Sequence, residues 1–140
     1  MKQNTSNNQY AGKTQLYDSE KYLKNYNKYL VDLITMFFDA KKHKKILEFG
    51  AGIGTLSNLF EEKFSIKPDV IEIDKDLIYS LKAQGFNVFS SLKSTSKKYD
   101  FIYSSNVLEH IKNDTIALQE IHAKMSNQSL LVLYLPAFMF

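Results

Sequence analysis

The composition and charge of this 140-residue chain restrict what it can be. Hydrophobic residues make up 44% and aromatic residues 14%, which predicts one globular domain and excludes a disordered chain. The net charge is +3 at pH 7, and all 18 basic residues are lysine, so bidentate arginine contacts to phosphate or guanine are excluded. Specific nucleic-acid binding is therefore not expected.

Cysteine is absent, which limits both redox chemistry and metal binding. A chain without cysteine has no disulfide and no thiolate metal site, and its three scattered histidines lack a ligand spacing, so no metal is expected. The longest apolar run, residues 130–135, is much shorter than the ~20 residues of a membrane-spanning helix. We therefore expect no membrane span and a cytoplasmic location.

The N-terminal region is predicted to hold a tail and one helix. Residues 1–15 are polar and predict a flexible tail, while residues 16–140 are expected to form the folded domain. Apolar residues over 23–38 recur at the spacing of an amphipathic helix, and Asp18 or Ser19 can cap its start.

From residue 46 onward, short apolar runs alternate with helical patterns. Strands are predicted over residues 46–49, 69–73, 87–89, 99–104 and 129–135, and helices over 55–64, 76–84 and 114–125, the last capped by Asp114. Nearly continuous apolar strands separated by helices predict an α/β fold with a parallel sheet covered on both faces. Right-handed crossovers then give a three-layer, doubly wound, Rossmann-like sheet of about five strands in the order 3-2-1-4-5.

A glycine-rich loop directly after the first predicted strand is the sharpest chemical signal. Glycines stand at every second position in Glu48-Phe49-Gly50-Ala51-Gly52-Ile53-Gly54, where a missing Cβ lets a ligand lie on the backbone. The dinucleotide fingerprint needs its third small residue at position 55, which is Thr55 here, so a nicotinamide dehydrogenase is disfavoured. A tight turn without a ligand is the alternative.

This loop resembles motif I of class I S-adenosylmethionine-dependent methyltransferases. The resemblance implies that Gly50, Ala51, Gly52 and Gly54 pack against the methionine part of S-adenosyl-L-methionine. It also implies that Glu48 lies under the cofactor and helps to hold its amino group.

A second match follows in Val70-Ile71-Glu72-Ile73-Asp74, at the end of the next predicted strand. A carboxylate at a strand end can accept hydrogen bonds from both ribose hydroxyls, and Glu72 matches the ribose-binding acid of the family. By the same resemblance Ile73 would lie against the adenine ring. Asp74 is expected to cap the following helix, although exchanged roles for Glu72 and Asp74 are an alternative.

The third match is the segment from Tyr99 to Ile111, which resembles the "fDlI…NVLEHI" segment of many small-molecule methyltransferases. It implies that Asn106 faces the methionine moiety and that Glu109 and His110 open a helix near the acceptor. His110 beside Glu109 could act as a general base on an acceptor hydroxyl or amine. The alternative is that both residues only shape the loop.

The resemblance also covers the helix before the first strand and implies an overall activity. Tyr22, Tyr26, Asn27 and Tyr29 look like the N-terminal cover over the cofactor in this family, with plain packing as the alternative. The implied function is methyl transfer to a small-molecule or lipid-like acceptor. The last two strands of the seven-stranded family fold are missing from the pattern, so a non-catalytic S-adenosylmethionine-binding or partner subunit is the alternative. A homo-oligomer or a complementing chain would then supply what is absent.

Overall fold

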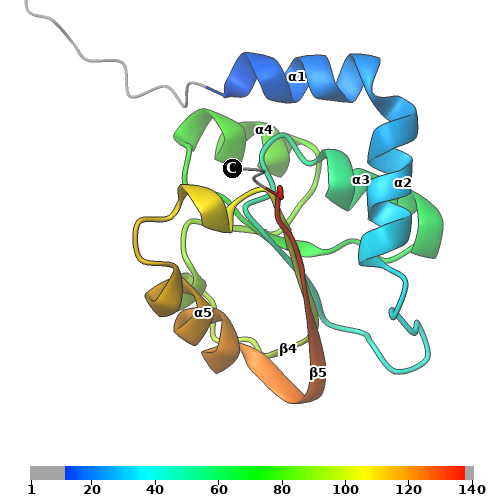
Figure 1. Ribbon diagram of the computed structural model, residues 1–140. Coiled ribbons are helices and arrows are strands. Elements are labelled where there is room, and N and C mark those ends of the chain that lie inside the picture. Colours follow the sequence, from blue (N-terminus) through cyan, green and yellow to red (C-terminus); the bar gives the residue numbers. More distant parts are fainter. Residues whose placement is uncertain (1–11, 138–140) are drawn as a thin grey trace, which may run out of the picture.

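A parallel sheet with helices on both faces makes up residues 12–137 of the computed structural model (Figure 1), which are the residues described below. The strands are β1 (Ile46–Phe49), β2 (Asp69–Ile71), β3 (Val88–Phe89), β4 (Tyr99–Ser105) and β5 (Met125–Tyr134). The helices are α1 (Lys13–Tyr22), α2 (Lys24–Ile34), α3 (Thr55–Phe64), α4 (Lys75–Ala83) and α5 (Asp114–Ala123), with two short 3-10 turns, η1 (Leu92–Ser94) and η2 (Leu108–His110). The order β3-β2-β1-β4-β5, parallel throughout, confirms the predicted topology.

Alternating side chains along the strands build a core on each face of the sheet. Ile46 of β1 packs with Phe101 and Tyr103 of β4 on the face that α2 and α3 cover. Leu47 and Ile102, the neighbours that point the other way, pack with Ile121 of α5. Figure 1 shows α5 on the opposite side of the sheet from α2 and α3. Both faces are therefore apolar, as parallel strands require.

The N-terminal region differs from the prediction, because two helices replace one. α1 begins at Lys13, inside the segment expected to be a tail, and Asp18 and Ser19 lie within it and do not cap a helix. Residues 1–11 lie outside the described part of the chain. The chain turns at Leu23, where φ is −113° and ψ is 33°, and α2 then follows. The apolar periodicity in the sequence arises from the face of α2 that packs on the sheet, so it did not predict α1.

Several boundaries farther along the chain also differ from the prediction. β2 ends at Ile71, two residues early. Asn113, not Asp114, caps α5, because its side-chain oxygen accepts the N–H of Ile116 at 3.1 Å. β5 begins at Met125, which pairs with Tyr99 before an irregularity interrupts the ladder. These differences leave the predicted order of elements unchanged.

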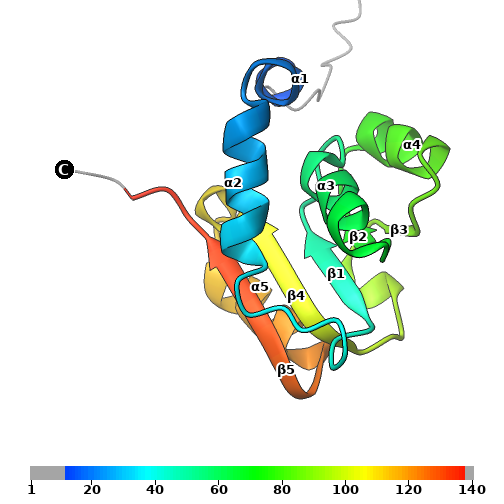
Figure 2. The same ribbon diagram turned by 90° about the vertical axis from the view of Figure 1, so that its right-hand side faces the viewer.

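α1 lies across the carboxyl ends of the central strands, whereas α2 runs down one face of the sheet (Figure 2). The carboxyl ends of β1, β2 and β4 therefore lie beneath a helical cover. No described helix is long and apolar enough to cross a membrane.

Candidate functional site

A cavity of about 770 Å³ opens at the carboxyl ends of β1, β2 and β4. The strand order reverses direction at β1, and in open α/β sheets ligands bind at this kind of switch point. Of the ten residues predicted to be catalytic or cofactor-binding, eight line the cavity: Glu48, Gly50, Ala51, Gly52, Glu72, Ile73, Asn106 and His110. Gly54 and Glu109 do not line it.

The glycine loop is shaped by contacts that exclude larger residues. Gly50 has φ +80°, and a Cβ there would lie 2.5 Å from a methyl carbon of Val107. Gly52, at φ +60°, faces Leu16 of α1 across the cavity rim. Gly54 has φ +90°, and a Cβ on it would meet Leu81 of α4 at 2.9 Å. Two glycines therefore form the cavity wall, and the third lets α3 pack against α4.

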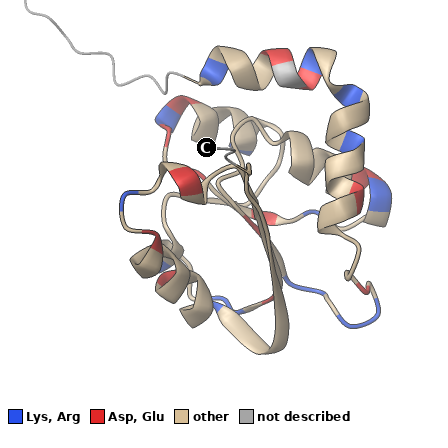
Figure 3. Ribbon diagram, in the orientation of Figure 1, with Lys and Arg blue, Asp and Glu red and all other residues tan. Residues whose placement is uncertain are grey.

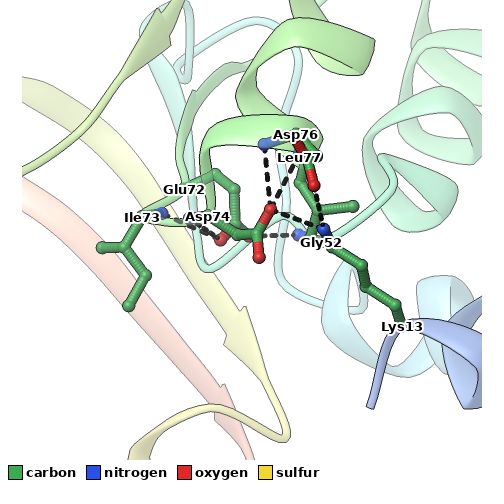
Figure 4. Close-up of polar contacts among 7 residues, drawn as sticks. All are labelled: Lys13, Gly52, Glu72, Ile73, Asp74, Asp76 and Leu77. Atoms are coloured by element: carbon green, nitrogen blue, oxygen red, sulfur yellow. Dashed lines mark hydrogen bonds and ion pairs between the residues drawn. The ribbon is translucent and has the colours of Figure 1, made fainter. Parts of the chain in front are cut away.

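Glu72 ties the loop after β1 to the loop after β2 (Figure 4). Its Oε2 accepts the N–H of Gly52 at 2.8 Å. Its Oε1 accepts the N–H groups of Ile73 and Asp74 at 2.8 and 3.0 Å. Three backbone donors thus hold one carboxylate at the edge of the cavity, in a bidentate orientation that two hydroxyl groups of a ligand could share.

The next two residues have clearly different environments. Ile73 is 82% exposed, so an apolar side chain is presented at the cavity without a protein partner for most of its surface. Asp74 caps α4, as predicted, because its Oδ1 accepts the N–H groups of Asp76 and Leu77 at 3.0 and 3.1 Å. Asp74 therefore caps α4, and Glu72 is the acidic residue that directly follows β2.

Lys13 of α1 closes the cover over this edge, and sequence analysis missed it. Its Nζ lies 2.9 Å from Oδ1 of Asp74 and 2.8 Å from Oδ2 of Asp76 (Figure 4). The hydrogen bonds to Asp76 and then Asp74 raise the pKa of Lys13. A lysine in a polar segment gives no local signal of such a pairing, because its partners lie some sixty residues away in sequence.

Replacing Lys13 with alanine is expected to loosen α1. Without the two ion pairs, backbone amides of α1 should exchange hydrogen roughly two- to fivefold faster, and the difference should shrink at high salt. Lys21→Ala, at the other end of α1, is the matched control because Nζ of Lys21 lies over the ring of Tyr22 and forms no ion pair within residues 12–137. Equal exchange rates in both variants would show that the ion pairs do not hold the helix.

Glu48 lies at the back of the cavity and is almost fully buried. Its Oε2 accepts hydrogen bonds from the hydroxyls of Ser57 and Tyr103. Burial raises the pKa of Glu48 to about 8, against the opposing effect of the two hydroxyls, and the nearby carboxylate of Glu72 adds a smaller increase. The carboxyl is therefore neutral at pH 7 unless a cation approaches it.

Carboxylates dominate the charge around the cavity. Glu72 and Asp74 line it as carboxylates beside the neutral carboxyl of Glu48, and no lysine among the described residues lines it. The lysines between α2 and β1 lie at the amino ends of the strands, away from the cavity (Figure 3). The site therefore favours a ligand that carries positive charge.

The two sides of the cavity entrance are formed by α2 and by the segment after β4. Tyr26 and Asn27 line the cavity, and the Tyr26 hydroxyl lies 3.2 Å from that of Tyr134. Tyr22 and Tyr29 are exposed and do not line it. Of the four residues expected to form a cover, Tyr26 and Asn27 therefore take that place.

Asn106, Glu109 and His110 follow β4 in a short turn instead of opening a regular helix. Asn106 adopts φ +54° and its N–H donates to the carbonyl of Tyr134 at 2.9 Å. His110 lies at the cavity edge with a 65% exposed side chain, and its Nε2 is 3.7 Å from Oε1 of Glu109. Within residues 12–137, Oε2 of Glu109 is buried without a hydrogen-bond partner. The arrangement places His110, rather than Glu109, within reach of a ligand.

No group of three or more histidines and carboxylates in the described chain is arranged to hold a metal ion. The polar groups around the cavity are instead backbone N–H groups, isolated carboxylates and neutral side chains. These are ligand-orienting groups for an organic molecule.

Comparison with known families identifies related sequences. Residues 22–138 match a family described as a methyltransferase domain. This match covers most of the chain and includes every site residue predicted above. No curated protein matches the sequence significantly.

Solved structures with a similar fold include three methyltransferases. Coclaurine N-methyltransferase, bound to N-methylheliamine and SAH, is 19% identical, with a TM-score of 0.65, over 76% of this chain and 35% of that chain. The plantazolicin methyltransferase BpumL, in complex with SAH, is 18% identical, with a TM-score of 0.67, over 91% of this chain and 53% of that chain. The glycopeptide N-methyltransferase MtfA, complexed with S-adenosyl-L-methionine, is 11% identical, with a TM-score of 0.65, over 76% and 53%.

These structures show the fold, and the chain spans between about a third and a half of their length.

Proposed function

Because the chain belongs to the methyltransferase-domain family, we propose that its cavity binds S-adenosyl-L-methionine and that it serves methyl transfer to a small-molecule acceptor. The observation that carries this proposal is the convergence of the glycine loop, Glu72 and Glu48 on one cavity at the switch point of the sheet. Its volume of about 770 Å³ lies in the range of small-molecule sites, roughly 300–1,000 Å³.

The residues present fit the chemistry of this cofactor. Glu72 offers carboxylate oxygens for the ribose hydroxyls, and Ile73 offers an exposed apolar surface for the adenine ring. Gly50, Ala51 and Gly52 leave room for the methionine part, with Glu48 below for its amino group. Gly54 supports the loop from behind through its packing against α4.

The cofactor, when bound, supplies a methyl group already activated by a sulfonium. The protein must then align the acceptor and exclude water, because in-line approach supplies most of what this transfer needs. Asn106 and Tyr26 border the space from which an acceptor would approach. In this proposal His110 takes a proton from an acceptor amine or hydroxyl, and Glu109 orients its ring. The alternative remains that Glu109 and His110 only shape the turn.

The relatives support an organic acceptor without identifying it. The matched structures are those of a coclaurine N-methyltransferase with N-methylheliamine, a plantazolicin methyltransferase and a glycopeptide N-methyltransferase. We therefore extend the proposed acceptor class from small molecules to modified peptides. An apolar, lipid-like acceptor is also compatible with the largely neutral lining around Leu30 and Ile111.

The second candidate is a subunit that binds the cofactor without transferring methyl groups by itself. In that case a second chain would pair along β5, whose outer edge carries no strand within residues 12–137. Turnover of an amine acceptor library by the isolated chain would exclude this candidate.

Isothermal titration with S-adenosyl-L-methionine tests cofactor binding, which both candidate functions require. We expect one-to-one binding, with a dissociation constant between about 1 µM and 1 mM. Gly52→Asp should weaken binding more than about tenfold, because a side chain there projects between the loop and Leu16 and fills the cavity rim. Gly85→Asp is the matched control, since Gly85 also has positive φ but lies after α4, outside the cavity. Absent binding by the wild type, or equal binding by the Gly52 variant, would refute the proposal.

A further inference from the structure

Three oxygen-bearing side chains from three different elements meet behind the cavity. Glu48 of β1, Ser57 of α3 and Tyr103 of β4 are 2%, 0% and 1% exposed. Glu48 and Tyr103 are register partners in the parallel sheet, so their side chains point to the same face. α3 packs on that face and places Ser57 between them. This cluster is built by the fold rather than by any local motif.

The hydrogen bonds from the two hydroxyls to the carboxyl of Glu48 end on the same oxygen. Tyr103 donates to Oε2 at 3.3 Å, Ser57 donates to Oε2 as well, and the two hydroxyl oxygens are 3.1 Å apart. The other oxygen, Oε1, receives neither of these bonds. Glu48 also lines the cavity, and the backbone of Ser57 adds a hydrogen bond to its carboxyl group, so the helix start and the two hydroxyls together fix its orientation toward the cavity.

The charge around this cluster is unbalanced. The titratable groups that act on Glu48 are Tyr103 and Glu72, and both are neutral or negative. No cation from the described elements neutralises the buried carboxyl. Burial and Glu72 therefore oppose its ionisation, while the two hydroxyls favour it. A cationic group entering the cavity would shift this balance toward the carboxylate.

We propose that Ser57 and Tyr103 are positioning residues: they hold Oε2 of Glu48 so that Oε1 meets the ammonium group of a bound cofactor, and they favour loss of the carboxyl proton on binding. The inference rests on the proposed function. In this step the O–H bond of the Glu48 carboxyl breaks, its proton leaves to the buffer, and the carboxylate pairs with the ligand ammonium. Binding is thereby coupled to the release of one proton.

The pH dependence of this coupling has a definite sign. The pKa of Glu48 without ligand is about 8, so below pH 8 most molecules carry the proton and release it on binding. Above pH 8 the carboxyl is already ionised, whereas the ligand's amino group, with an ordinary pKa of about 8, must gain a proton to pair with it, so binding takes up protons. Loss of the Tyr103 hydroxyl removes a bond that favours the carboxylate, so the pKa of Glu48 should rise and release should persist to higher pH.

Titration calorimetry with S-adenosyl-L-methionine, in buffers of different ionisation enthalpy from pH 6.5 to 9.5, measures this release. The wild type should release protons at pH 7, where Glu48 carries its proton, and take up protons at pH 9.5, where the ligand amine must gain one. Tyr103→Phe should bind roughly tenfold more weakly at pH 7, as expected for a lost hydrogen bond to a charged group, with its release profile shifted to higher pH. Ser57→Ala should also weaken binding and shift the release profile to higher pH. Glu48→Gln should abolish proton release.

Tyr99→Phe is the matched control for a purely structural effect. Tyr99 is equally buried on the same strand, but its hydroxyl donates to Asp69 at 2.9 Å and does not reach the cavity. Tyr99→Phe should have a lower free energy of unfolding than the wild type, but it should bind the cofactor and release protons as the wild type does. The contrast between two buried tyrosines of β4 separates positioning from folding.

A readout in the ligand-free protein distinguishes failure of this inference from failure of the proposed function. Carboxyl-carbon NMR should show the Glu48 titration moving to higher pH in Tyr103→Phe and Ser57→Ala, and unchanged in Tyr99→Phe. If the wild type fails to bind S-adenosyl-L-methionine, the proposed function fails and this inference with it. If it binds but Tyr103→Phe and Ser57→Ala retain wild-type affinity, proton release and Glu48 titration, the inference alone is overturned.

Discussion

Gly50→Ala is expected to lower the free energy of unfolding by about 3 kcal/mol and to abolish detectable binding of S-adenosyl-L-methionine. At φ +80° a Cβ costs about 1–2 kcal/mol of backbone strain. The added carbon would also lie 2.5 Å from a Val107 methyl group, and relieving such overpacking costs about 1–3 kcal/mol. Because Val107 itself lines the cavity, any shift that relieves the contact deforms the site.

Gly85→Ala separates the cost of backbone strain from the cost of overpacking. Gly85 has a similar φ of +85°, but the atom nearest to a Cβ added there would be the flexible Nζ of Lys67, at 3.3 Å. This variant should lose about 1 kcal/mol, from backbone strain alone, and bind normally. Denaturant unfolding of both variants, followed by calorimetric titration, provides the measurement. Equal losses in the two variants would mean that the contact with Val107 is relieved at no cost.

Glu72→Gln is expected to weaken cofactor binding by roughly 100-fold and to lower the free energy of unfolding by about 2 kcal/mol. The carboxylate accepts three backbone N–H groups from two loops, and an amide replaces one acceptor with a donor. If its NH₂ group faces Gly52, the loop after β1 loses its tie to the loop after β2. The same change removes one of the oxygens proposed for the ribose hydroxyls.

Asp69→Asn provides the control for this experiment. Asp69 begins β2, at the far end of the strand from the cavity, and accepts bonds from Tyr99 at 2.9 Å and Lys97 at 2.8 Å. Its amide variant should lose stability but keep cofactor affinity, as measured by denaturant unfolding and calorimetric titration. Unchanged affinity in Glu72→Gln would exclude Glu72 as a ribose ligand.

Much of the site could be predicted because its signals are local in sequence. The glycines after β1 and the acid after β2 stand at strand ends, and parallel strands bring those ends to one edge of the sheet. The sequence therefore predicted that Gly50, Gly52 and Glu72 lie near one another, and all three line the same cavity. Gly54 shows the limit of this reasoning, because its neighbours Leu81 and Phe86 come from another part of the chain.

The sequence by itself determined the order of helices and strands from β1 onward, the parallel sheet and the loop that faces the cavity. Periodicity, capping and glycine spacing depend on near neighbours, so they can be followed along the chain. Only the tertiary structure decided that α1 covers the site through Lys13, and that Tyr103 and Ser57 hold Glu48. Lys13 and Asp76 are 63 positions apart, and Glu48 and Tyr103 are 55 apart. Contacts of that range depend on strand register and helix packing, which no local pattern records.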